Sequence, residues 1–127
     1  MNELVLIRTL MTPEINFNRD SGVLKIAGRA FASDISVFYK RMEEWLEVYL
    51  KDPNEITTIE LEIEYCNSIF SKLLFGFFAK AKTLCENDKK LQIKWFHEEG
   101  DSDSIDDAIR ISRIIDYPIE TVEILMD

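Results

Sequence analysis

The chain has 127 residues, 46% of them hydrophobic and 31% charged, which is the size and composition of one folded soluble domain. It has 24 acidic residues against 15 basic ones, a net charge of -9. Because this charge opposes the phosphates of nucleic acids and the anionic face of membranes, we expect neither as a partner.

The N-terminal sequence and the cysteines indicate in which cellular compartment the protein is expected. Residues 1–4 contain no basic segment that leads into a long apolar run, so no secretory signal is predicted. The most apolar stretch, residues 69–84, is interrupted by serine and lysine and does not qualify as a membrane span. Cys66 and Cys85 lie in apolar surroundings. We therefore expect a single cytoplasmic domain, residues 1–127.

The predicted elements begin with a β-hairpin. An apolar opening, residues 4–10, is followed by the short runs Glu14–Phe17 and Val23–Ala27. Between these runs lies Asn18–Gly22, whose composition is typical of a turn.

The first predicted helix follows the hairpin. Ser33 or Asp34 is its expected N-cap, and Pro53 with Asn54 ends it. Between them, apolar residues recur at three- and four-residue steps, as on the buried face of a helix. These residues are Ile35, Phe38, Met42, Trp45, Leu46 and Tyr49.

The next strand has one polar face. Residues 59–65 alternate apolar side chains with three glutamates. A strand covered on both faces would be apolar throughout, so we expect the helices mainly on one side of the sheet. Lys25 and Lys94 occupy the polar face of two other predicted strands and are expected to lie opposite the glutamates.

The most apolar helix begins at Asn67-Ser68, directly after this strand. An alternating strand around residues 91–95 and an acidic loop, Glu98–Asp103, follow it. The third helix, with Ser104 or Asp103 as its cap, ends at Tyr117-Pro118, and a last strand covers Thr121–Leu125.

This order of elements predicts an α/β fold. Each strand-helix-strand unit should be a right-handed parallel crossover. We therefore expect a mixed, mostly parallel sheet with an N-terminal hairpin and helices mainly on one face.

The acidic loop is the first candidate for chemistry, because the single histidine, His97, precedes it. A calcium loop of the Asp-x-Asp-x-Asp-Gly type is not present, since Ile105 takes the fifth place. No glycine-rich phosphate loop, Cys-x-x-Cys pair or nucleophile elbow occurs. The sequence predicts a protein without enzymatic activity or cofactor. A small-ligand or metal site around His97 stays as the alternative.

The second candidate is Ser68, at the junction between a strand and a helix. It is expected at or near the N-cap, with an accessible hydroxyl. Capping alone is the simpler interpretation from the residues. A phosphate there would add about two negative charges at the positive end of the helix dipole and change the surface offered to a partner.

Several segments, taken together, resemble the SiaC-type regulatory phosphoproteins, which belong with the STAS-like, anti-sigma-factor-antagonist-like domains. The resemblance extends from about Thr12 to the last strand. Its most specific part is the family segment Tyr-x-Asn-Thr-Ser-Ser-x-Lys, which here is Tyr65-Cys66-Asn67-Ser68-Ile69-Phe70-Ser71-Lys72. The other segments are Thr12-Pro13, Gly28, Trp95-Phe96, and the aromatic residues Phe38, Trp45 and Tyr49.

The resemblance implies a STAS-like fold and a phosphorylation switch. In the family, a dedicated kinase phosphorylates the threonine after the asparagine, and a metal-dependent Ser/Thr phosphatase restores it. Ser68 occupies that position. In the best-known branch, the unphosphorylated form binds and activates a diguanylate cyclase in cyclic-di-GMP signalling. Other relatives act on different partners, and a sigma-factor regulator is the second option for this chain.

The resemblance also places the partner-binding residues around Ser68. They are Asn67, Ile69, Phe70, Ser71 and Lys72. Ile69 and Phe70 replace two serines of the family segment, and residues 29–34 depart from the Ser-x-Pro-Glu expected after Gly28. Exposed apolar residues usually indicate contact with another protein, so we expect a retained switch and a changed partner, unless one of the pair belongs to the core.

Overall fold

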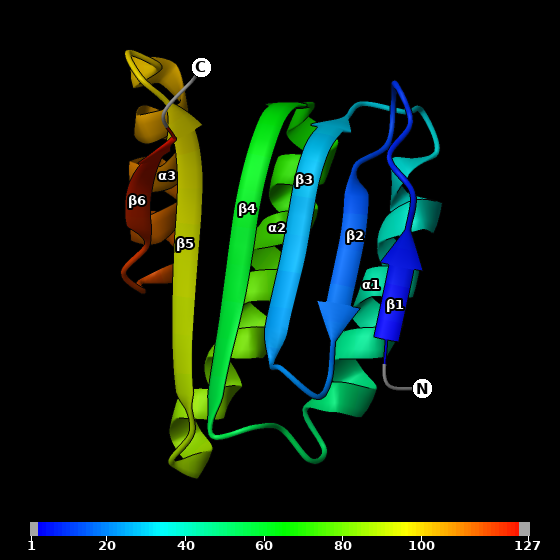
Figure 1. The fold of residues 1–127 in the computed structure, drawn as a ribbon, viewed down its shortest axis with the longest axis vertical. Coiled ribbons are helices and arrows are strands. Elements are labelled where there is room, and N and C mark those ends of the chain that lie inside the picture. Colours follow the sequence, from blue (N-terminus) through cyan, green and yellow to red (C-terminus); the bar gives the residue numbers. More distant parts are fainter. Residues whose placement is uncertain (1–2, 125–127) are drawn as a thin grey trace.

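The computed structural model describes residues 3–124 and contains a six-stranded sheet, whose strands lie side by side in chain order (Figure 1). The strands are β1 (Glu3–Leu6), β2 (Glu14–Asn18), β3 (Val23–Ala30), β4 (Ile56–Cys66), β5 (Lys90–Glu98) and β6 (Glu120–Ile124). β1, β2 and β3 form an antiparallel meander, and each later strand runs parallel to its predecessor. The predicted hairpin is thus extended by an edge strand.

Three helices connect the parallel strands, and all of them lie behind the same face of the sheet in Figure 1. They are α1 (Ile35–Tyr49), α2 (Ser68–Ala81) and α3 (Ser102–Ile115). A short 3₁₀ helix, η1 (Lys82–Asn87), follows α2. The mixed, mostly parallel α/β sheet with helices on one face confirms the predicted fold class. Among the described residues, no helix combines the length and the apolar character needed to cross a bilayer.

The core lies between the helices and the covered face of the sheet. Phe17 of β2 is fully buried, and its ring centroid lies 5.3 Å from that of Trp45 in α1 and 5.6 Å from that of Phe77 in α2. Buried aromatic clusters of this kind contribute more than their area alone, because tilted ring pairs attract one another. The cluster joins the meander to the first two helices.

The open face of the sheet has the predicted alternation of charge. Glu60 lies in register between Lys25 of β3 and Lys94 of β5. Cross-strand pairs of opposite charge stabilise neighbouring strands. The prediction that these lysines lie opposite the glutamates is therefore confirmed.

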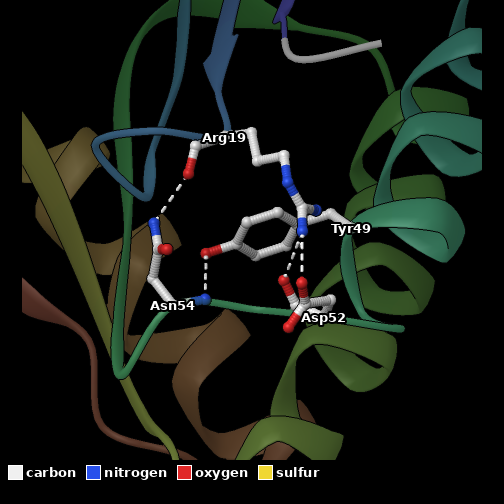
Figure 2. Close-up of polar contacts among 4 residues, drawn as sticks. All are labelled: Arg19, Tyr49, Asp52 and Asn54. Atoms are coloured by element: carbon white, nitrogen blue, oxygen red, sulfur yellow. Dashed lines mark hydrogen bonds and ion pairs between the residues drawn. The ribbon is translucent and has the colours of Figure 1, made fainter.

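Polar contacts fix the end of the sheet where β3 and β4 begin (Figure 2). The Arg19 guanidinium donates to the carbonyl and to the carboxylate of Asp52, both at 2.9 Å. The Asn54 side chain donates to the Arg19 carbonyl at 2.7 Å, and the Asn54 N–H donates to the Tyr49 hydroxyl at 3.3 Å. The turn between β2 and β3 is thereby tied to the connection between α1 and β4.

One helix start agrees with the prediction in position only, and another differs from it. Asp34 occupies the N-cap of α1, but its side chain accepts no capping hydrogen bond. The predicted cap of α3, Ser104 or Asp103, is wrong, because the Asp101 carboxylate accepts from the Ser104 N–H at 3.1 Å. The acidic stretch contains several good caps, and composition alone does not select among them.

Candidate functional site

The junction between β4 and α2 is built on Asn67. Its backbone is extended, with φ -78° and ψ 171°, and its side-chain oxygen accepts from the Phe70 N–H at 2.9 Å. Its own N–H donates to the Ala30 carbonyl of β3 at 2.9 Å. Asn67 is therefore the N-cap of α2, and Ser68 is the first residue inside the helix. Ser68 thus lies next to the N-cap, as expected, but the capping side chain is that of Asn67.

Ser68 lies on the surface at the positive end of the α2 dipole. The first turn of α2 contains no acidic residue. Lys72 is exposed and follows Ser68 by four positions, the spacing at which helical side chains are neighbours. The backbone N–H groups of a first helical turn lack partners within the helix and bind anions readily. A phosphate on Ser68 would thus meet favourable charge on its own helix.

The apolar pair after Ser68 divides between surface and core. The Ile69 side chain is 51% exposed, whereas Phe70 is 0% exposed and belongs to the core. The prediction that Phe70 binds a partner is therefore wrong, because its ring is not accessible. Successive helical residues point about 100° apart, so one of two adjacent apolar residues turns inward.

The remaining predicted contact residues lie around this helix start. Ser71 is half-buried, and its hydroxyl pairs with the Cys66 thiol at 3.3 Å. Tyr65 was not predicted as a contact residue, yet it is 57% exposed, and its ring centroid lies 5.5 Å from that of Phe31. Its place in the alternating strand suggested an inward ring, but the register of β4 against β3 shifts between Gly28 and Arg29, so that Tyr65 pairs with the exposed Arg29. Together, Tyr65, Ile69 and Lys72 form the exposed surface around Ser68, which we call the Ser68 surface.

The Cys66 thiol gives a chemical test of this geometry. Burial raises the pKa of the Cys66 thiol, so its reactive thiolate form is scarce near neutral pH. Cys85 is exposed. We expect iodoacetamide to modify Cys85 well before Cys66, as followed by peptide mass mapping. Equal rates at the two thiols would contradict the burial of Cys66.

His97 does not lie on the surface of the acidic loop. It is 8% exposed, and its Nδ1 lies 2.9 Å from the Glu98 carbonyl oxygen. Glu98, Glu99, Asp101 and Asp103 are exposed. Within residues 3–124, no three His, Cys, Asp or Glu side chains come close enough to hold a metal ion.

A feature that the sequence did not reveal is an open cleft of about 580 Å³ between the carboxyl ends of β4 and β5. Its lining includes His97 and the exposed glutamates that end the two strands. Alternating patterns continue through both strands, so no break in the sequence marks the position of the cleft.

A family model described as SiaC family regulatory phosphoprotein matches residues 6–124. The chain belongs to the SiaC family. Solved SiaC structures share its fold. The crystal structure of apo-SiaC from Pseudomonas aeruginosa has a TM-score of 0.84 at 17% identity, covering 95% of this chain and 98% of that one.

A second SiaC structure from Pseudomonas aeruginosa has a TM-score of 0.86 at 16% identity, covering 98% of this chain and all of that one. A chain in the crystal structure of diguanylate cyclase SiaD in complex with its activator SiaC, from Pseudomonas aeruginosa, has a TM-score of 0.88 at 16% identity. That match covers 95% of this chain and 99% of the other. No curated protein sequence matches this SiaC-family chain.

Proposed function

We propose that this SiaC-family chain is a non-enzymatic, cytoplasmic signalling switch of the STAS-like type, whose binding to a protein partner is controlled by reversible phosphorylation of Ser68. The observation that supports this most directly is an exposed hydroxyl on the first residue of α2, within a chain of a regulatory phosphoprotein family. A Ser/Thr kinase and a metal-dependent phosphatase would add and remove the phosphate.

Ser102 is the natural comparison for Ser68. It is also exposed, it is the first residue of α3, and an Asx residue, Asp101, caps its helix. Each serine thus follows an Asx cap whose side chain accepts from the N–H three residues on, although ψ is 171° at Asn67 and 75° at Asp101. Asp101 and Asp103 flank Ser102, whereas the first turn of α2 has no acid, so a phosphate is disfavoured at Ser102 and tolerated at Ser68.

The partner would contact the Ser68 surface. Ile69 and Tyr65 supply apolar area, and exposed apolar side chains next to a regulated position are typical of protein contacts. A phosphate with about two negative charges beside Ile69 would have to be desolvated when this area is covered, which is costly. Phosphorylation would thus release the partner, and the unphosphorylated form would bind it.

A diguanylate cyclase is the first partner to test. One structural neighbour of this chain belongs to a complex in which SiaC is the activator of the cyclase SiaD. We propose the same class of partner here, and therefore a role in cyclic-di-GMP signalling. Activity as an anti-sigma-factor antagonist, acting on a sigma-factor regulator, stays the second prediction from the sequence.

Phosphorylation by the cognate kinase is expected to add one phosphate, on Ser68. Intact-mass measurement and peptide mapping after co-expression with the kinase would locate it. The Ser68→Ala variant should lose the modification, and Ser102→Ala should keep it. A phosphate found only at other positions would refute the proposal.

Measuring how variants bind the cyclase distinguishes a regulatory Ser68 from a serine with a structural role only. Ser68→Asp should weaken binding by about tenfold or more, because a charge within an apolar contact costs about 1.4 kcal/mol or more. Ser68→Ala and the control Ser102→Asp should bind normally. Since Asn67 is the cap, Ser68→Ala should also change the free energy of unfolding by less than about 0.5 kcal/mol. Unchanged binding by Ser68→Asp would argue against the switch.

A further inference from the structure

The sheet is split at the carboxyl ends of its two central parallel strands. β4 and β5 pair from Ile56 and Lys90 as far as Leu61 and Trp95, and no further. β4 then continues beside β3, and β5 beside β6, as the diverging strands in Figure 1 show. The cleft of about 580 Å³ lies between them, within the size range of ligand pockets.

Both walls of this cleft are strand edges. Over residues 62–65 and 96–98, each strand pairs only on the side away from the cleft. In the described part of the chain, no backbone hydrogen bond joins the two segments. Open strand edges present rows of N–H and C=O groups that pair readily with an added extended segment.

Side chains alternate along the β5 wall and along the β4 wall as far as Ile63, after which the register of β4 against β3 shifts. Glu62, Glu64 and Glu98 belong to the open face of the sheet, whereas Ile63 and His97 belong to the helix-covered face. In an extended segment bound in the cleft, successive side chains would also point to opposite faces of the sheet. Alternate side chains of that segment would therefore meet the glutamates, and those between them would meet Ile63 and His97.

The charged residues that line the cleft determine which sign of charge a bound ligand should carry. Carboxylates line the cleft at Glu62, Glu64, Glu98 and Asp101, and the lining cation is Arg29. The Glu64 carboxylate is compensated in part, because the Arg8 guanidinium lies 3.2 Å from it. The surplus of negative charge disfavours phosphates and nucleotides and favours basic side chains. Phe31, Tyr65 and Phe96 add aromatic surface, on which lysine and arginine pack well.

His97 adds a polar side chain to the lining of the cleft. The side chain is more than nine-tenths buried and lines the cleft, and its Nδ1 lies near the Glu98 carbonyl oxygen. Among residues 3–124, its Nε2 makes no hydrogen bond, and it is not a buried atom without a partner, so it is open to water. That nitrogen is available to a polar group of a bound segment.

We propose that this cleft binds an extended segment of a protein partner that has basic residues at alternating positions, and that the segment adds a strand between β4 and β5. The open strand edges, the spacing of side chains along the walls and the negative charge of the lining all fit such a segment. A free polyamine would satisfy the charge but would leave the backbone groups unused. This goes beyond the phosphorylation switch, because the cleft lining shares Tyr65 with the Ser68 surface but does not include Ser68, Ile69 or Lys72.

Peptide binding to the intact protein tests the proposal. A fluorescent peptide of alternating lysine and valine should bind in an anisotropy titration at low salt and dissociate as salt is added. The double variant Glu62→Gln, Glu98→Gln should bind it about tenfold more weakly, since two exposed charge pairs are lost. The control Glu86→Gln, on η1 at the other end of β5, should bind like the unaltered protein.

Three results would overturn the proposal. The first is no binding of the alternating peptide. The second is equal binding of a peptide with the same residues in separate lysine and valine blocks, or complete displacement by spermidine at equal charge, because charge alone would then account for binding. The third is an absence of slowed amide exchange at residues 62–65 and 96–98 when the peptide is saturating. Ser68→Ala should leave peptide binding intact, so this test and that of the switch can fail separately.

Discussion

Replacing Phe70 with alanine is expected to lower the free energy of unfolding by about 3–5 kcal/mol. The ring is 0% exposed and lies in the first turn of α2, on the same buried side as Leu74 and Phe77. Truncation removes buried apolar surface and leaves a cavity between the helix and the sheet. A domain of ordinary stability would lose a large part of its free energy of unfolding. Urea unfolding followed by circular dichroism measures the effect.

Ile69 provides the matched control, because it is the adjacent apolar residue on the same turn. Its side chain is 51% exposed, so Ile69→Ala should cost less than about 1 kcal/mol. The same variant should weaken the binding of a partner to the Ser68 surface. Similar losses of stability in both variants would mean that the two residues are not divided between surface and core.

The fold was predictable because its strands repeat one simple pattern. Residues 59–65 alternate apolar residues with glutamates, which fixed both the strand and the side of the sheet that the helices cover. The lysines of β3 and β5 then lay opposite the glutamates by register. A period of two leaves little choice, since a slip by one residue would turn every apolar side chain toward water.

The details of the candidate site were less predictable, because they depend on contacts between distant segments. Asn67 and Ser68 are both good N-caps, and what decides between them is the hydrogen bond from Asn67 to Ala30 of β3. The apolar stripe of α2 is so broad that periodicity did not separate Ile69 from Phe70. The cleft has no sequence signal, since it arises where pairing between β4 and β5 stops.

The apolar residues at the start of the chain show that hydrophobic composition alone does not predict which residues are buried. Only the first part of residues 4–10 forms strand, and Leu4 of β1 is buried. Ile7 and Leu10, which follow β1, are 85% and 78% exposed. An apolar run at the edge of the sheet is thus not buried throughout, since β1 is the edge strand.

Replacing Gly22 with alanine is expected to lower the free energy of unfolding by about 2–4 kcal/mol. Gly22 has φ +74°, and an added Cβ would lie 2.7 Å from the Ile56 carbonyl oxygen and 2.9 Å from the Asn54 side-chain nitrogen. Its own carbonyl accepts from the Thr58 N–H at 2.9 Å, so the turn has little room to move away. The change would disturb the polar corner drawn in Figure 2, where Asn54 holds Arg19.

A second glycine, Gly100, distinguishes backbone strain from steric contact as the cause of this loss of stability. It has φ +79°, close to that of Gly22, but an added Cβ would meet nothing within 4 Å. Gly100→Ala should therefore cost only the backbone strain, about 1–2 kcal/mol. The extra loss in Gly22→Ala, measured by urea unfolding of both variants, is the contribution of the close approach between the β2–β3 turn and the start of β4. Equal losses would show that backbone strain alone requires glycine at position 22, and that the corner can adjust to a methyl group.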